Sequence, residues 1–206
     1  MYFQKTKELL VQEATDLFYE YGYVKTPIRK ITENLQVENT IIYYYFKNKD
    51  ALLFTIIESI IDDMLRGLEN VISLYPDPME RVQQMIFFQI SLLGDRKKEV
   101  KIFVEDTDKL TLEMQKKIKD KERKVYELYA GQFSLLIREK KIKGIELPVI
   151  NFALFGMINW VYRWFKEEGP LPLEAVALRT IEILFSGLMA VTSGQNPDQK
   201  TKSSND

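Results

Sequence analysis

Apolar residues recur at the spacing of an α-helix along almost the whole chain. The first such segment carries a stripe at intervals of three or four residues, made of Leu10, Ala14, Leu17, Phe18 and Tyr21. Gly22 then offers a C-terminal stop for this helix. No segment follows the alternating apolar and polar pattern of a half-buried strand better than it follows a helical one. The chain is therefore predicted to be all-α, with about nine helices.

Capping residues predict where several of these helices begin. Thr26 and Pro27 form an N-cap and first-turn pair for a short second helix. Asn48 is a suitable N-cap for a long helix that carries an apolar stripe from about Ala51 to Leu74.

Three prolines open helices in the rest of the chain. Asp77 and Pro78 resemble a capping box with proline at the first helical position. Pro148 and Pro172 open two apolar helices, over about residues 147–167 and 172–190. The polar tail, residues 192–206, is predicted to be disordered because it has almost no apolar content.

Composition excludes several classes of function. The 206 residues include no cysteine and no histidine, which removes disulfides, Cys/His zinc sites and the Ser-His-Asp triad. We therefore expect no metal and no cofactor. The chain has no signal peptide pattern and no uninterrupted run of about 18 apolar residues, so we expect a cytoplasmic protein with no membrane partner.

An enzyme would have to depend on carboxylates such as Glu105, Asp106 and Asp108, or on tyrosine and lysine chemistry. These carboxylates lie in the segment 95–124, which is dense in charges of both signs. Such a segment is typical of a solvated helix surface. We therefore expect that the protein is not an enzyme.

Residues 26–45 have the spacing of a helix-turn-helix. A short helix with Ile28, Ile31 and Leu35 on its buried face is followed by a very short connection at residues 36–38 and by another short helix through about Tyr45. This arrangement places the second of the two short helices in the major groove of DNA. Residues 1–49 contain seven Lys/Arg and six Asp/Glu, a net charge of +1, so attraction to DNA must come from clustered charges.

The segment from Ala14 to Leu53 resembles the TetR family of transcriptional regulators. It reads "ATDLFYEYGYVKTPIRKITENLQVENTIIYYYFKNKDALL", against a family pattern of "A..LF...G...TS...IA...GVS.GTLY.HF..K..L". The agreement runs in order without a gap and includes Leu17, Phe18, Gly22, Thr26, Ile31, Val37, Ile42, Tyr43, Phe46, Lys49 and Leu52. The sequence departs from the pattern at Gln36, where the family has glycine, and at residues 38–40, where Glu-Asn-Thr replaces Ser-x-Gly.

The resemblance implies a recognition helix over Asn39–Tyr45 and a dimer that binds a near-palindromic DNA operator, usually as a repressor. It further implies a helix-turn-helix domain at residues 1–49 and a ligand-binding and dimerisation domain at residues 50–191. In this family the last two long helices pair with those of a second copy, which makes the protein a homodimer.

Helical phase divides the aromatic residues of the recognition helix. At about 100° per residue, Val37, Ile41, Ile42 and Tyr45 lie on one side, while Asn39, Thr40, Tyr43 and Tyr44 lie on the other. Asn39 can pair with adenine through two hydrogen bonds, and a tyrosine hydroxyl can donate to phosphate. The candidate DNA-binding residues, for bases and phosphates together, are Lys25, Thr26, Arg29, Lys30, Asn39, Thr40, Tyr43, Tyr44, Lys47 and Lys49.

A small, largely apolar effector of unknown identity is expected in the aromatic core of the second domain. The candidate ligand-binding residues are Phe88, Phe103, Tyr126, Tyr129, Phe133, Asn151, Phe155 and Asn159. Plain core packing is the alternative for each of them. For the whole chain, the alternative is an all-helical dimeric sensor or adaptor that does not read DNA sequence.

Overall fold

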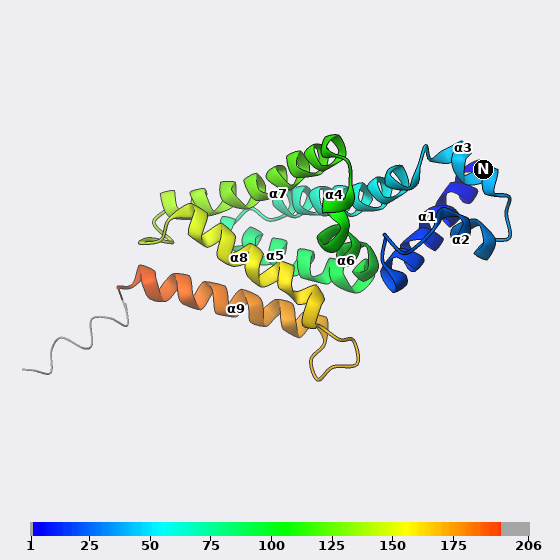
Figure 1. Cartoon of the computed structure of the whole chain (residues 1–206). Helices are drawn as coiled ribbons and strands as arrows, with labels where there is room; N and C mark the ends of the chain where they lie inside the picture. Colours follow the sequence, from blue (N-terminus) through cyan, green and yellow to red (C-terminus); the bar gives the residue numbers. More distant parts are fainter. Residues whose placement is uncertain (1, 195–206) are drawn as a thin grey trace, which may run out of the picture. The chain divides into compact units, whose positions relative to one another are not determined.

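The computed structural model describes residues 2–194, and within this range every regular element is helical (Figure 1). The predicted all-α class is confirmed. The elements are α1 (Tyr2–Tyr21), α2 (Ile28–Asn34), α3 (Asn39–Tyr45), α4 (Lys49–Leu74), α5 (Pro78–Asp95), α6 (Lys97–Asp106), the 3-10 helix η1 (Thr107–Lys109), α7 (Leu112–Arg138), α8 (Leu147–Trp164) and α9 (Leu173–Thr192).

The chain divides into two compact units. The first comprises residues up to Leu65 together with Asp95–Arg123, and the second comprises Arg66–Gly94 and the residues from Lys124 onward. The helices α4 and α7 each contribute to both units.

In the first unit, α1 packs against α2, α3 and α6. Its buried face contains the predicted residues Leu10, Ala14, Leu17 and Phe18. Tyr21 departs from the predicted stripe, since 45% of it is exposed. It is the last residue of α1, and its ring contacts Lys30 Nζ of α2 at 3.6 Å.

Two of the predicted caps are confirmed. Asn48 Oδ1 accepts a hydrogen bond from the Ala51 amide at 2.9 Å, at the start of α4. Asp77 Oδ1 accepts from the amides of Met79 and Glu80 at 2.9 and 3.0 Å, at the start of α5. Each carboxylate or amide oxygen satisfies amides that the first helical turn leaves without a partner.

The predicted N-cap at Thr26 is wrong. The Thr26 hydroxyl lies 2.9 Å from the Gly22 carbonyl and 3.2 Å from the Leu17 carbonyl, so it donates to the end of α1. The helix α2 begins at Ile28, after Pro27, and no side chain caps it. The carbonyls of Leu17 and Gly22 therefore compete successfully with the amides of α2 for this side chain.

In the second unit, α8 and α9 pack together and each buries one face. By length and composition, α9 is the one helix within the described range that could cross a membrane, although only 28% of its apolar window is buried. Of the tail that was predicted to be disordered, Thr192 ends α9 and residues 195–206 lie outside the described residues.

Candidate nucleic-acid interface

The helix α3 presents a polar and aromatic face to solvent. Tyr43 and Tyr44 are 54% and 73% exposed, and Asn39 and Thr40 are exposed as well. Ile42 is completely buried on the opposite side. The predicted division of the helix into an outward and an inward face is confirmed. Such a face suits the major groove, because it carries side chains that can donate, accept and make apolar contacts.

The turn between α2 and α3 is made without glycine. Gln36 has a φ of +54°, in the left-handed region that residues with a Cβ adopt at a cost. Its amide donates to the Glu33 carbonyl at 3.1 Å, and the Val37 amide donates to the Thr32 carbonyl at 3.0 Å. These two bonds close the tight turn that sets α3 against α2.

Two polar side chains of α3 have partners in its immediate surroundings. Asn39 Oδ1 lies 3.1 Å from the Thr32 hydroxyl, which comes from α2. The Thr40 hydroxyl donates to Glu38 Oε2 at 3.2 Å. Sequence reasoning missed Thr32, because its partner lies on a different helix and seven residues away, beyond the reach of helical periodicity.

The candidate phosphate-binding residues fall into three groups. Lys25 and Lys47 are exposed. Arg29 pairs with Glu33 at 2.6 Å, and Lys30 Nζ lies 3.6 Å above the centre of the Tyr21 ring. Thr26 is only 1% exposed, and α1 engages its hydroxyl.

Lys49 contacts the connection between α1 and α2. Its Nζ donates to the Val24 carbonyl at 3.4 Å and lies 4.2 Å above the centre of the Tyr23 ring. Partial burial lowers the pKa of Lys49, and the charges of Asp50 and Asp106 oppose this effect. The Tyr23 hydroxyl in turn donates to Asp50. The cation thus sits at the start of α4, beside a tyrosine and two carboxylates.

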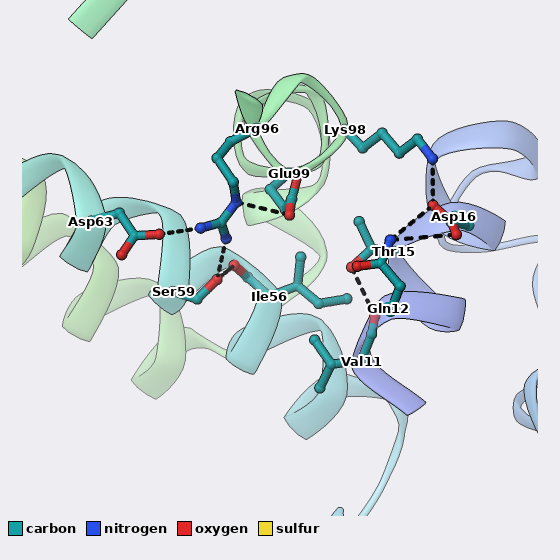
Figure 2. Close-up of polar contacts among 10 residues, drawn as sticks. All are labelled: Val11, Gln12, Thr15, Asp16, Ile56, Ser59, Asp63, Arg96, Lys98 and Glu99. Carbon is teal, nitrogen blue, oxygen red and sulfur yellow. Dashed lines mark hydrogen bonds and ion pairs between the residues drawn. The ribbon is translucent and has the colours of Figure 1, made fainter. Parts of the chain in front are cut away.

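The helix α6 makes polar contacts with both α1 and α4 inside the first unit (Figure 2). The Arg96 side chain, just before α6, reaches Asp63, Ser59 and Glu99, and its bonds to Ser59 and Glu99 measure 3.0 and 2.9 Å. Lys98 Nζ pairs with Asp16 of α1 at 2.6 Å. These contacts connect the helix that supports α2 and α3 with the helix that follows them.

The structure brings together some of the candidate ligand-binding residues. In the second unit, Phe155 stacks on Tyr126 with ring centres 6.3 Å apart and meets Tyr129 edge-on at 5.4 Å. Phe133 is completely buried, whereas Asn159 is exposed. Another candidate, Phe103, belongs to the first unit.

Phe88 packs against backbone. Its ring lies so close to Gly67 that a Cβ at Gly67 would come 1.8 Å from Phe88 Cζ. Glycine is therefore required at residue 67, and the Phe88 ring takes the place that a side chain there would fill. In the structure Phe88 acts as a packing residue between α5 and α4.

Asn151 is the polar residue in this part of the core whose hydrogen bonding is incomplete. It is completely buried, and its Nδ2 donates to the Leu147 carbonyl at 3.1 Å. Its Oδ1 accepts no hydrogen bond from any residue in the described part of the chain. Tyr129, also completely buried, donates to Gln89 at 3.0 Å. Burial raises the pKa of Tyr129, so it remains a neutral donor.

An all-α chain whose helix-turn-helix exposes Asn39, Thr40, Tyr43 and Tyr44 belongs to the class of helix-turn-helix DNA-binding proteins. Residues 10–56 match the family described as bacterial regulatory proteins, tetR family, and residues 75–188 match the tetracyclin repressor-like C-terminal domain. The chain therefore belongs to the TetR family of transcriptional regulators, and it is a DNA-binding regulator.

Two curated relatives from Bacillus subtilis cover most of the chain. The fatty acid metabolism regulator protein is 25% identical over 87% of this chain and 93% of its own length. The uncharacterized HTH-type transcriptional regulator YhgD is 24% identical over 83% of this chain and 90% of its own length.

Solved structures agree with the fold. The crystal structure of AibR in complex with isovaleryl coenzyme A and operator DNA is 26% identical, with a TM-score of 0.79 over 87% of this chain and 97% of that chain. PfmR from Thermus thermophilus is 20% identical, with a TM-score of 0.82 over 87% of this chain and 98% of its own.

Proposed function

We propose that the protein is a ligand-responsive repressor that binds a near-palindromic DNA operator as a homodimer and is released by a small, largely apolar effector. The observation that carries the proposal is the exposed face of α3, where Tyr43, Tyr44, Asn39 and Thr40 lie together. Two tyrosines exposed on a seven-residue helix offer a partner both an apolar ring surface and a polar hydroxyl.

An outward apolar face on α8 and α9 supports dimerisation. On α8, Phe152, Trp160 and Trp164 are at least half exposed. On α9, Leu178 and Ile183 are exposed to a similar degree. The opposite faces of both helices are buried in the second unit, so the apolar composition of α9 is consistent with burial against a second copy. A dimer would also explain why the operator should be near-palindromic.

The effector is proposed to bind in the core of the second unit, beside Asn151, Tyr126, Tyr129 and Phe155. A buried amide oxygen without a donor costs free energy that a ligand hydrogen bond would recover. Phe155 lies one turn further along α8, and its ring contacts with Tyr126 and Tyr129 favour an apolar ligand. AibR is named as a complex with isovaleryl coenzyme A, and another relative is named for fatty acid metabolism, so acyl compounds are the first class to test.

The domain assignment and the cellular location follow from the same proposal. Residues 1–49 would read DNA, and residues 50–191 would bind the effector and form the dimer. A repressor of this kind acts in the cytoplasm, where its operator is, and it catalyses no reaction. Under this proposal Glu105 and Asp106, at the end of α6, and Asp108, in η1, take part in no catalysis.

The test is retardation of DNA from the region upstream of the protein's own gene. We expect sequence-specific binding whose affinity falls steeply as the salt concentration rises, because phosphate contacts release counterions. Acyl-coenzyme A thioesters and free fatty acids are then added to the complex, and one of them is expected to release the DNA. Equal binding to operator and scrambled duplexes would favour the alternative, a dimeric sensor or adaptor without sequence-specific DNA binding.

A further inference from the structure

Thr32 lies beneath the recognition helix with its hydroxyl directed at Asn39. The residue is only 1% exposed, and it belongs to α2, the helix that precedes the tight turn. Its Oγ1 lies 3.1 Å from Asn39 Oδ1 and 3.0 Å from the carbonyl oxygen of Arg29. Asn39 itself is exposed, so one buried hydroxyl contacts a side chain that faces outward.

The hydroxyl has a single proton and two oxygens within reach. The Arg29 carbonyl is in the first turn of α2, where a carbonyl also accepts the amide four residues later in the helix. The same hydroxyl also reaches Asn39 Oδ1, on a different helix. A bond to Oδ1 distinguishes the two ends of the amide, which have nearly the same shape and opposite hydrogen-bonding character.

The orientation of this amide decides which base it matches. Adenine presents one acceptor and one donor in the major groove, N7 and the N6 amino group, whereas guanine presents two acceptors, N7 and O6. When the orientation of the Asn39 amide is fixed, its oxygen, the acceptor, stays on one side and its NH2 group, the donor, stays on the other. The amide therefore fits adenine and sets oxygen against oxygen at guanine.

We propose that Thr32 is a positioning residue for sequence specificity: its buried hydroxyl fixes the Asn39 amide so that this side chain prefers adenine over guanine. The inference rests on the proposed operator binding and concerns one base position within it. Thr32 touches no base in this arrangement, because it is buried under α3 and acts through Asn39.

The experiment starts with the wild-type protein and a library of 30-base-pair duplexes with a randomised centre. Bound duplexes are selected and sequenced, and the base position at which Asn39→Ala relaxes the preference is assigned to Asn39. Affinities of Thr32→Val and Thr32→Ser are then measured for a pair of duplexes with adenine or guanine at that position. We expect Thr32→Val to reduce the preference for adenine by about three- to tenfold, as the loss of one hydrogen bond implies. Thr32→Ser keeps the hydroxyl and should therefore retain the preference for adenine.

Controls separate this role from a structural one. Melting curves verify that each variant folds. If Thr32→Val does not fold, Thr32→Ala serves as a second variant without the hydroxyl. In the Asn39→Ala background, Thr32→Val should leave the ratio between adenine and guanine unchanged. A uniform loss of affinity for both duplexes, or an unchanged preference in both hydroxyl-free variants, would overturn the inference alone. A wild-type protein that selects no sequence would overturn the proposed function and this inference with it.

Discussion

Lys98 Nζ lies 2.6 Å from Asp16 Oδ1 and joins α6 to α1. Two residues earlier, Arg96 contacts Asp63 and Ser59 of α4. The start of α6 therefore holds the helix that supports the recognition helix and also the helix that follows it. Both contacts lie within the first unit. They differ in exposure, since about half of the Lys98 side chain is in solvent and about a quarter of the Arg96 side chain is.

This difference predicts unequal costs of removing the two cations. Lys98→Met should lower the free energy of unfolding by less than about 1 kcal/mol, because exposed ion pairs contribute little. Arg96→Met should lower it by about 1–3 kcal/mol, because three hydrogen-bonded contacts are lost from a partly buried side chain. Urea denaturation of both variants measures the difference. Equal costs would mean that the contacts of Arg96 add no more to stability than a surface pair.

Gln36→Gly should stabilise the protein by about 1 kcal/mol. Gln36 has a φ of +54°, and a residue with a Cβ pays about that amount in the left-handed region. Gln36→Ala is the matched control, because alanine keeps the Cβ and should leave stability unchanged. Thermal unfolding of the two variants tests the prediction. If glycine and alanine had the same effect, backbone strain would not be the cause.

Local interactions were predictable from the sequence, and interactions between helices were not. Asn48 and Asp77 cap amides two or three residues away, so their neighbours in the sequence were sufficient to predict them. Thr26 has the same chemistry, but its hydroxyl donates to the carbonyls of Leu17 and Gly22 and caps no amide of α2. Its partner depends on how the chain turns after Gly22, which local propensity does not specify.

The same limit applies to the candidate site. Helical phase was sufficient to place Tyr43 and Tyr44 outward and Ile42 inward, because all three belong to one regular helix. The contact between Thr32 and Asn39 depends on the geometry of the turn at Gln36, which neither helical phase nor the family resemblance specifies.

Tyr43→Phe should weaken operator binding by about five- to tenfold without unfolding the protein. The side chain is 54% exposed, and a hydrogen bond from its hydroxyl to a charged phosphate contributes more than about 1 kcal/mol. Fluorescence anisotropy with a labelled operator duplex measures the affinity. Tyr75→Phe, in the connection between α4 and α5, is the control for loss of a tyrosine hydroxyl elsewhere. Identical affinities of Tyr43→Phe and wild type would exclude the phosphate contact.

Asp106→Asn should raise stability at neutral pH and have little effect at about pH 3. Partial burial, with a further contribution from Glu105, raises the pKa of Asp106 in the folded protein. A raised carboxyl pKa means that the folded state binds protons more strongly than the unfolded chain, so stability is lost as pH rises through the folded pKa. The asparagine removes that loss.

Urea denaturation at several pH values tests this sign. Asp120→Asn, which changes an exposed carboxylate on α7, is the control for a general effect of charge. If Asp106→Asn were destabilising at pH 7, the carboxylate would have to be stabilised by its surroundings.

Asn151→Leu should stabilise the protein in the absence of effector and abolish its response to the effector. The buried Oδ1 accepts no hydrogen bond from the described residues, and an unsatisfied buried acceptor costs about 1–3 kcal/mol. Leucine has a similar volume and removes that cost, although it also gives up the bond to the Leu147 carbonyl. Thermal unfolding with and without an acyl-coenzyme A series measures both effects, since a ligand that binds the folded state raises the melting temperature.

Gln132→Leu is the matched control, because this buried amide already accepts from Arg81 at 3.2 Å and its loss should destabilise. A less stable Asn151→Leu protein that still responds to the acyl compound would assign Asn151 to packing and place the effector elsewhere.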